Sequence, residues 1–497
     1  MTGFRCSKIA FVVGVVFAMA VASHAQSFNV LASFQGGTSG ADPWTAPLVQ
    51  GVDGNFYGTT WAGGNANSTF CPQTCGTIFK ITPAGQLTTL YKFCSLANCA
   101  DGFEPFSGLV LGTNGNFYGT TTFGGANPVN SQSFGTVFEM TPGGQLTTLH
   151  SFCSLTNCAD GSLPQAGLVQ GIDGNFYGTA YSGGDSFLGT AFKISPSGDF
   201  TALHSFCTVP RCKDGFDPMG TLAVATDGNL YGTTAGGGVA SGGTIFRLTP
   251  SGKVSPVYAF PSISFNPLIA NGVIQGADGN LYGTKMFDPS GFGSVFQLTP
   301  TGQFTILADL CNQGLCPAGA EPQSQLVQAS DGNFYGTTAG FGEITGDDEG
   351  GVFEITPSGV LTALYRFCPQ QTTCPDGSTP YAGLLQATNG TFYGVTFYGG
   401  TGCGETGCGV VFTVSAGLPA FAQSNPGFGR VGRVVGILGN NLASTTSVTF
   451  NGVAAQFKVI SSTYLKAQVP TGATTGAITV TTSGGTLNSN VPFNVLP

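Results

Sequence analysis

The residues of this 497-residue chain that could do chemistry are its cysteines, a few acidic residues and a set of aromatic side chains. After Cys6, fourteen cysteines stand in close pairs: Cys71/Cys75, Cys94/Cys99, Cys153/Cys158, Cys207/Cys212, Cys311/Cys316, Cys368/Cys374 and Cys403/Cys408. If the chain is exported, an even set of local pairs predicts seven short-loop disulfides. Zinc is disfavoured because the spacers do not fit a zinc knuckle and only two histidines follow the leader segment.

Before the first strand of several repeats, an acidic residue stands directly before a proline: Asp42, Glu104, Asp217 and Glu321. If these segments approach the axis of a ring, their carboxylates could surround its mouth and hold a hard cation such as calcium. The alternative is turn chemistry, because acidic residues before proline commonly begin turns. The ring is incomplete and lacks ligand spacing, so no metal and no cofactor is assigned.

Eight aromatic residues are candidates for a ligand-binding platform: Trp44, Trp61, Phe123, Tyr181, Phe287, Phe341, Phe397 and Tyr398. Aromatic rings around one face could stack on sugar rings. The alternative is that they shield the hydrophobic core beneath them from water.

Catalytic residues are harder to find. His150 and His204 occupy a repeat position that holds Tyr91 and Tyr365 in other copies, which marks them as interchangeable surface residues. The sequence contains no GxSxG elbow near a histidine, no metal triad and no phosphate loop. Carboxylates from distant repeats could still meet to hydrolyse a glycosidic bond, so an enzyme remains an open alternative.

A repeated phrase defines the elements that must position these residues. Its seven copies, from DGNFYGTT at Asp53 to NGTFYGVT at Asn389, place tyrosines 51 to 61 residues apart. This period is typical of a propeller or solenoid. The tyrosines are Tyr57, Tyr118, Tyr177, Tyr231, Tyr282, Tyr335 and Tyr393.

Each repeat contains four short runs of alternating hydrophobicity, which is the content of one propeller blade. In the first repeat these runs are 47–50, 55–60, 76–82 and 86–93. The seventh repeat lacks its fourth run, and residues 29–34 resemble one, so an N-terminal strand should close the ring. The sequence therefore predicts an all-β protein with a seven-bladed β-propeller at 26–415 and a β-sandwich at 416–497.

The strand order also predicts two unlike faces. Connections between second and third strands, and between blades, leave by one face, whereas the Asp-Gly and Pro-x-Gly turns lie on the other. All seven cysteine pairs fall in the long connections. We call these the loop face and the turn face, and we expect any ligand on the loop face.

Two family resemblances follow from these residues. The repeats, with GNFYGTT followed by GTIFKITPAG, resemble the GloVer (Gloeo/Verruco) tandem repeat of exported bacterial proteins, which implies no particular activity. The last segment, with Val448-Thr449-Phe450-Asn451-Gly452 and Val469-Pro470-Thr471-Gly472, resembles an IPT/TIG domain. That resemblance implies an immunoglobulin-like sandwich used for binding or spacing.

The bulk properties restrict location and partners. Residues 1–25 have the charged, apolar and small-residue regions of a secretory signal peptide, so we expect export to the periplasm, cell surface or medium. No later segment has 18 consecutive apolar residues, so no membrane-spanning segment is expected after cleavage. The net charge of −9 and the lack of a basic stripe disfavour nucleic acid as a partner.

The sequence favours an exported, non-catalytic binding or surface-interaction protein, expected to be a monomer. Its ligand would be a glycan or a protein held on the loop face. Two alternatives stay open: an extracellular polysaccharide lyase or glycoside hydrolase, and a structural spacer at the cell surface.

Overall fold

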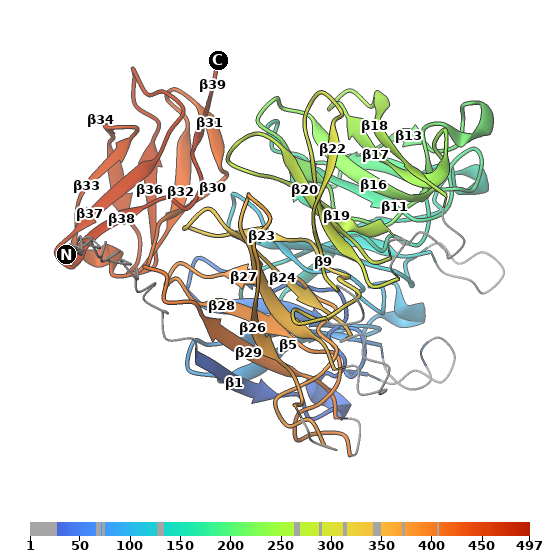
Figure 1. Ribbon diagram of the computed structural model, residues 1–497, viewed down its shortest axis with the longest axis horizontal. Helices are drawn as coiled ribbons and strands as arrows, with labels where there is room; N and C mark the ends of the chain where they lie inside the picture. The colour runs from blue at the N-terminus through green and yellow to red at the C-terminus, as the bar shows by residue number, and fades with distance from the viewer. Residues whose placement is uncertain are drawn as a thin grey trace, which may run out of the picture.

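The computed structural model describes residues 27–65, 71, 75–126, 134–262, 269–287, 291–311, 316–340, 349–369, 373–404 and 407–497. These residues form antiparallel sheets arranged as a ring, with a second all-β unit at the C-terminal end (Figure 1). Within the described part of the chain, no helix is long and apolar enough to cross a membrane. The predicted signal peptide, residues 1–25, lies outside the described residues and stays a prediction.

Seven sheets form the blades of the ring, which confirms the predicted propeller. Blades 1 to 3 consist of β2 (Val49–Gln50), β3 (Phe56–Thr60), β4 (Thr77–Ile81) and β5 (Leu87–Lys92); β6 (Val110–Leu111), β7 (Phe117–Thr121), β8 (Thr136–Met140) and β9 (Leu146–Ser151); and β10 (Val169–Gln170), β11 (Phe176–Ala180), β12 (Thr190–Ile194) and β13 (Phe200–Ser205). Blades 4 and 5 consist of β14 (Phe216–Pro218), β15 (Ala223–Val224), β16 (Leu230–Gly236), β17 (Ser241–Leu248) and β18 (Val254–Pro261); and β19 (Ile269–Gln275), β20 (Leu281–Lys285), β21 (Ser294–Leu298) and β22 (Phe304–Asp309).

Blades 6 and 7 complete the ring. They consist of β23 (Val327–Gln328), β24 (Phe334–Thr338), β25 (Gly351–Ile355) and β26 (Leu361–Arg366); and β27 (Leu385–Gln386), β28 (Phe392–Val395), β29 (Val410–Ser415) and β1 (Ser27–Ser33). In blade 7, β1 pairs with β29 from Ser27 opposite Ser415 to Ser33 opposite Val410. The predicted closure by the N-terminal strand is therefore confirmed, because β1 is the outer strand of blade 7.

The repeated DGNFYG phrase folds as a turn held by its own aspartate. In blade 1 the Asp53 carboxylate accepts hydrogen bonds from the Asn55 backbone N–H at 3.2 Å, the Asn55 side chain at 2.6 Å and the Tyr57 hydroxyl at 2.9 Å. The same three bonds recur at Asp173, Asp227, Asp278 and Asp331. The phrase is therefore a structural device on the turn face, since it satisfies the polar end of an otherwise buried tyrosine.

The rest of the phrase packs the blades together. The Tyr57 ring contacts Phe117 of the next blade, with ring centroids 4.1 Å apart, and Tyr393 stacks on Phe56 at 3.9 Å where the ring closes. The residue after each tyrosine is glycine, because a side chain at this position would not fit. A Cβ at Gly58 would lie 2.7 Å from Cζ of Phe79 and 2.8 Å from Cδ2 of Leu48. The Tyr-Gly pair is therefore a packing element of the ring.

The C-terminal unit is a β-sandwich. One sheet has the order β30 (Gln423–Asn425), β32 (Val434–Leu438), β36 (Tyr464–Gln468), β35 (Phe457–Val459), and the other β34 (Val453–Ala454), β33 (Thr445–Phe450), β37 (Ile478–Thr482), β38 (Gly485–Asn488). A short parallel pair joins β31 (Phe428–Arg430) to β39 (Asn494–Leu496). The remaining regular elements are single-turn 3-10 helices: η1 (Gly37–Ser39), η2 (Ala97–Cys99), η3 (Thr156–Cys158), η4 (Pro210–Cys212) and η5 (Leu442–Ser444).

This sandwich lies beside the ring (Figure 1), and its contacts are with the turn face. The Thr463 hydroxyl donates a hydrogen bond of 2.8 Å to the Val52 carbonyl in blade 1, and the Asn425 side chain donates one of 3.1 Å to the Leu111 carbonyl in blade 2. Leu438 of the sandwich is only 3% exposed and belongs to the hydrophobic cluster of blades 1 and 2. The sandwich therefore covers part of the turn face, and among the described residues it does not extend to the loop face.

Candidate functional site

The loop face carries the seven disulfides that the sequence predicts. Five lie in connections between blades and two in connections between second and third strands. Seven disulfides fit an exported protein, because thiols in the cytosol are kept reduced. The disulfides join Cys71 to Cys75, Cys94 to Cys99, Cys153 to Cys158, Cys207 to Cys212, Cys311 to Cys316, Cys368 to Cys374 and Cys403 to Cys408.

Aspartates hold four of the five inter-blade disulfide loops in place. Asp160 is fully buried and accepts hydrogen bonds from Nε2 of His150 at 3.0 Å and from the Ser154 hydroxyl at 2.7 Å. Burial by itself would raise the pKa of Asp160, but these bonds outweigh it and hold the pKa below its ordinary value. In blade 1 Tyr91 makes the same contact to Asp101 at 2.8 Å.

The fifth inter-blade loop, closed by Cys311 and Cys316, departs from this pattern. In the other four loops an aspartate stands two residues after the second cysteine, whereas Ala318 stands two residues after Cys316. Cys311 and Cys316 are each 5% exposed and form a small hydrophobic cluster with Ala320, against which Phe292 packs. The predicted disulfide at Cys316 is confirmed, but apolar packing replaces the carboxylate that holds the other loops. Residues 312–315, between the two cysteines, lie outside the described residues.

The prediction that the two histidines are surface residues is wrong in one respect. His150 and His204 are half-buried and each bonds a buried aspartate, Asp160 and Asp214, at 3.0 Å. They do replace tyrosine as predicted, because either ring can reach the same carboxylate. Through these bonds the two histidines help to hold the disulfide loops in place.

The acidic residues before proline occupy one repeated turn. Asp42, Glu104, Asp217 and Glu321 all have a positive φ, between 52° and 56°. The backbone N–H of Asp42 bonds the Cys408 carbonyl of the preceding blade at 3.0 Å. In the same way each of the other three donates to the blade before it. The backbone at this position is therefore a turn that fastens neighbouring blades, as the alternative interpretation expects.

Their side chains do not gather into a metal site. Among the described residues, the only groups of three ligand atoms within 4.8 Å of one another contain disulfide cysteines, and none contains any of these four carboxylates. Two of the four pair with aromatic residues instead. Glu104 accepts a hydrogen bond of 3.1 Å from the Trp61 indole N–H, and Asp217 accepts one from Tyr181.

Aromatic side chains of three blades meet in one cluster on the loop face. Trp44 stacks on Tyr381, with centroids 5.5 Å apart and planes 16° apart, and contacts Trp61 at 5.7 Å, Phe397 at 4.6 Å and Phe106 at 5.4 Å. Tyr398 extends the cluster by packing edge-on against Phe397 at 4.4 Å. The cluster spans blades 7, 1 and 2 and contains four of the eight predicted aromatic residues.

The other four lie elsewhere. Phe123 stacks on Phe103 at 5.5 Å over the core of blade 2, which is the shielding role, and Tyr181 bonds Asp217 between blades 3 and 4. Phe287 is half-buried in blade 5. Phe341 lies outside the described residues. A continuous aromatic platform around the ring is therefore not what the described residues form.

Sequence reasoning missed two members of the cluster, Phe106 and Tyr381. Both follow a residue-proline pair, as Trp44 does in Asp42-Pro43-Trp44. Aligning the residue after that proline across the repeats would have placed all three rings at equivalent positions around the axis.

A cleft of about 450 Å³ borders this cluster. Its walls contain Asp42, Trp61, Glu104 and Tyr398, with backbone of Gly36, Gly37, Gly63 and Gly407 and the Cys403/Cys408 disulfide. Tyr398 is 41% exposed. Burial raises the pKa of Asp42 to about 6, and it also raises the pKa of Glu104 despite the opposing hydrogen bond from Trp61. We call this the blade 7-1-2 cleft.

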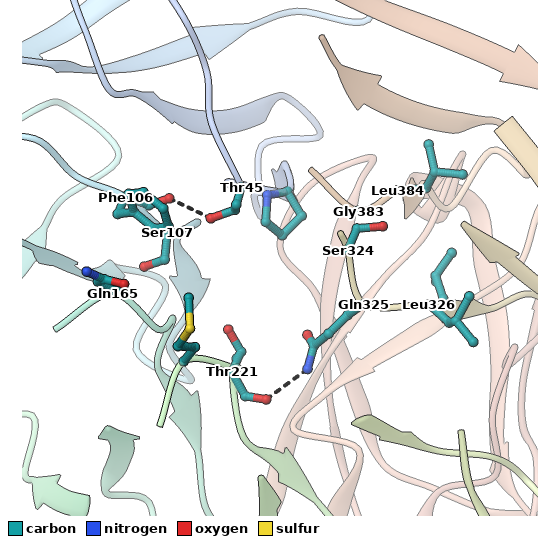
Figure 2. Close-up of a pocket in the computed structure, with 13 residues that line it drawn as sticks. Thr45, Phe106, Ser107, Gln165, Thr221, Ser324, Gln325, Leu326, Gly383 and Leu384 are labelled. Carbon is teal, nitrogen blue, oxygen red and sulfur yellow. Dashed lines mark hydrogen bonds between the residues drawn. The ribbon is translucent and has the colours of Figure 1, made fainter. Parts of the chain in front are cut away.

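A smaller cavity of about 170 Å³ lies on the axis of the ring (Figure 2). Its lining comes from the segments that lead into the innermost strands and includes Thr45, Phe106, Gln165 and Thr221. The Gln325 side chain reaches across it and donates a hydrogen bond of 2.8 Å to the Thr221 carbonyl (Figure 2). It also donates one of 3.3 Å to the Val273 carbonyl. Because ligand pockets usually measure roughly 300 to 1,000 Å³, the cleft is the better candidate and the axial cavity is of a size for water.

Comparison with solved structures gives distant likenesses. The PQQ-bound aldose sugar dehydrogenase of Streptomyces coelicolor is 15% identical, with a TM-score of 0.38 over 79% of this chain and 99% of that one. A puromycin hydrolase is 14% identical, with a TM-score of 0.43 over 72% of this chain and 53% of that one. At these values the likeness says nothing about the activity of this chain. No curated protein matches it by sequence.

Family models match nearly all of the chain. The Gloeobacter/Verrucomicrobia repeat matches residues 3–206, 69–285 and 266–447, and the IPT/TIG domain matches residues 419–495. Both resemblances seen in the sequence are confirmed. The chain therefore belongs to the Gloeobacter/Verrucomicrobia repeat family and ends in an IPT/TIG domain.

Proposed function

We propose that this protein is an exported glycan-binding protein whose binding site is the blade 7-1-2 cleft. The observation that carries the proposal is the cleft itself, in which Trp61 and Tyr398 stand beside Asp42 and Glu104 on the uncovered face of a rigid ring. Exposed aromatic rings offer an apolar surface to the C–H face of a sugar, and carboxylates accept hydrogen bonds from its hydroxyl groups.

Rigidity of the cleft supports binding with little loss of entropy. The Trp61 ring is held by its hydrogen bond to Glu104 and its contact with Trp44. The Cys403/Cys408 disulfide closes the loop beside Tyr398. Preorganised side chains lose little conformational freedom on binding, so a small contact area can give useful affinity.

One observation favours a second candidate, a glycoside hydrolase. Asp42 has a pKa of about 6 because of burial, which suits a general acid, and Glu104 lies in the same cleft. Against this, Glu104 is already bonded to Trp61, and the acidic residues sit on turns that fasten the blades. Binding explains the same residues without requiring a second catalytic group.

A structural spacer fits the molecule less well. A domain that acts as a spacer is expected to be joined by a flexible linker and to make few contacts with the ring. Leu438 and Thr463 of the IPT/TIG domain instead pack against blades 1 and 2. This domain covers the turn face and leaves the loop face available. We assign it to support of the ring.

The proposal is tested by a glycan array with the purified full-length exported protein, followed by product analysis of every glycan that binds. Bound and intact glycans whose affinity falls at least tenfold in Trp61→Ala, but not in Phe287→Ala, are the expected result. Cleavage of a bound glycan would promote the hydrolase. Absence of binding across the array, or equal binding by both variants, would refute the assignment of this cleft.

A further inference from the structure

The blade 7-1-2 cleft is negatively charged without compensation. Asp42 and Glu104 both line it, and no lysine, arginine or histidine is present among its described lining residues. Neither carboxylate has a cationic side chain within 4 Å in the described part of the chain. The raised pKa values of both groups are what burial without a counter-charge produces.

The hydrogen-bond partners show which atoms are available. Glu104 uses one oxygen, Oε2, to accept the Trp61 indole N–H, and no described side chain bonds its other oxygen. For Asp42 no hydrogen-bond partner of its carboxylate exists among the described residues, although its backbone is fixed by the Cys408 carbonyl. The cleft therefore presents acceptors that lack donors, next to two aromatic rings.

This combination selects among sugars by charge. Uronic acids and sulfated sugars carry a negative charge, so the two carboxylates repel them. A protonated amine supplies both a positive charge and hydrogen-bond donors, and charge-assisted hydrogen bonds are about twice as strong as neutral ones. An ammonium group is also attracted to the faces of Trp and Tyr rings.

We propose that the blade 7-1-2 cleft binds amino sugars with a free, protonated amine, such as oligomers of glucosamine, in preference to their N-acetylated forms. This inference rests on the proposed glycan-binding function and names the class of glycan. The amine lies between the carboxylates of Asp42 and Glu104, and the sugar ring lies against Trp61 or Tyr398.

Calcium is the competing occupant for two carboxylates, and the described residues do not favour it. Calcium takes six to eight oxygen ligands, whereas these carboxylates belong to no group of three ligand atoms within 4.8 Å. A lysine side chain of a partner protein is the other competitor. It shares the ammonium group but brings no sugar ring to the aromatic walls.

The experiment compares glucosamine oligomers with N-acetylglucosamine oligomers of the same length by calorimetry on the full-length exported protein, at low and at high salt. We expect the free amine to bind about tenfold more tightly at low salt, a ratio equal to about 1.4 kcal/mol. The preference should fall at high salt, because the carboxylates are partly exposed. Asp42→Asn and Glu104→Gln should each remove most of it.

Matched controls come from the same repeat position in other blades. Asp217→Asn and Glu321→Gln change the equivalent carboxylates outside the cleft and should leave the preference unchanged. Thermal unfolding of each variant separates lost binding from lost structure, and asparagine tolerates the positive φ of position 42.

The possible results distinguish failure of the amine preference from failure of glycan binding as a whole. Equal or tighter binding of the acetylated oligomer would leave glycan binding standing and refute the amine preference. Calcium binding that Asp42→Asn abolishes, or capture of a lysine-rich peptide with no response to amino sugars, would also refute it. If no glycan of any kind binds, the proposed function and this inference both fail.

Discussion

Replacing Asp42 with asparagine should stabilise the protein at neutral pH and have little effect in acid. In the folded protein burial raises the pKa of Asp42 from 3.8 to about 6, because the ionised carboxylate is poorly solvated and unpaired. Below about pH 3.8 the carboxyl group is protonated in both the folded and the unfolded chain. Between these values the unfolded chain ionises first, so stability falls as the pH rises, and above about pH 6 the loss is complete.

The magnitude follows from the size of that shift. At about 1.36 kcal/mol per pKa unit the full shift corresponds to about 3 kcal/mol. Part of the carboxylate faces the open cleft and is screened by solvent, so we expect a gain of about 1 to 2 kcal/mol for Asp42→Asn at pH 7.5. Asparagine has nearly the same shape and accepts the positive φ of 55°, so no strain is added.

Urea unfolding at pH 7.5 and pH 3.5 measures the difference directly. Asp217→Asn is the matched control, because the Asp217 carboxylate occupies the same turn but accepts a hydrogen bond from Tyr181. Burial raises the pKa of Asp217, and this hydrogen bond opposes the rise. The control should gain less. An equal gain at both pH values, or no gain at pH 7.5, would show that Asp42 is not an unpaired buried charge. A gain in stability together with a loss of amino-sugar binding would mark Asp42 as a residue kept for function at a cost in stability.

Further predictions concern the scaffold. Leu438→Ala should lower the free energy of unfolding by about 2 to 5 kcal/mol and separate the unfolding of the two domains in calorimetry. Val434→Ala, at a position 55% exposed on the same strand, should change neither. Identical calorimetric traces for the two variants would contradict the docking of the IPT/TIG domain. Gly58→Ala should lower stability by about 1 to 3 kcal/mol in thermal unfolding because its Cβ overlaps Phe79, while Gly143→Ala, with only one atom within 4 Å, at 3.8 Å, should be close to neutral. Asp160→Asn should lower the free energy of unfolding by about 1 to 3 kcal/mol at pH 7. Because the pKa of Asp160 in the folded protein is below 3.8, the greater stability of the wild type should persist above about pH 4 and decrease as the pH drops further. A stability difference that does not change with pH would refute the role of Asp160 in holding its disulfide loop. Peptide mapping without reduction should recover all seven disulfides, and free thiols in the exported protein would contradict the account of the loop face.

Much of the fold could be predicted because the repeat carries its own local chemistry. The Asp53, Asn55 and Tyr57 contacts lie within five consecutive residues, so each copy of the phrase specifies its turn wherever it occurs. Cysteines four to six positions apart lie in one short loop, so their local pairing could also be predicted from the sequence. The missing strand of blade 7 was visible because a ring must pair its last sheet with its first segment.

The candidate site depended on contacts that no local pattern contains. Trp44, Tyr381 and Phe106 come from blades 1, 7 and 2, and residues 44 and 381 meet only because the ring brings its ends together. The bond from Trp61 to Glu104 crosses from one blade to the next, so the aromatic and acidic sets could not be recognised as one site from their separate spacings. Burial of Leu438 against the turn face likewise depends on where the second domain docks.

The sequence by itself therefore determined the blades, their closure, the disulfides and the two unlike faces, because all of these follow from short-range chemistry repeated at a regular period. Only the tertiary structure decided which aromatic residues face a cleft, which carboxylates lack a partner, and which face the IPT/TIG domain covers. The physical reason is that burial and electrostatic pairing are properties of side chains brought together from distant positions. In this ring those positions meet only when the last blade packs against the first.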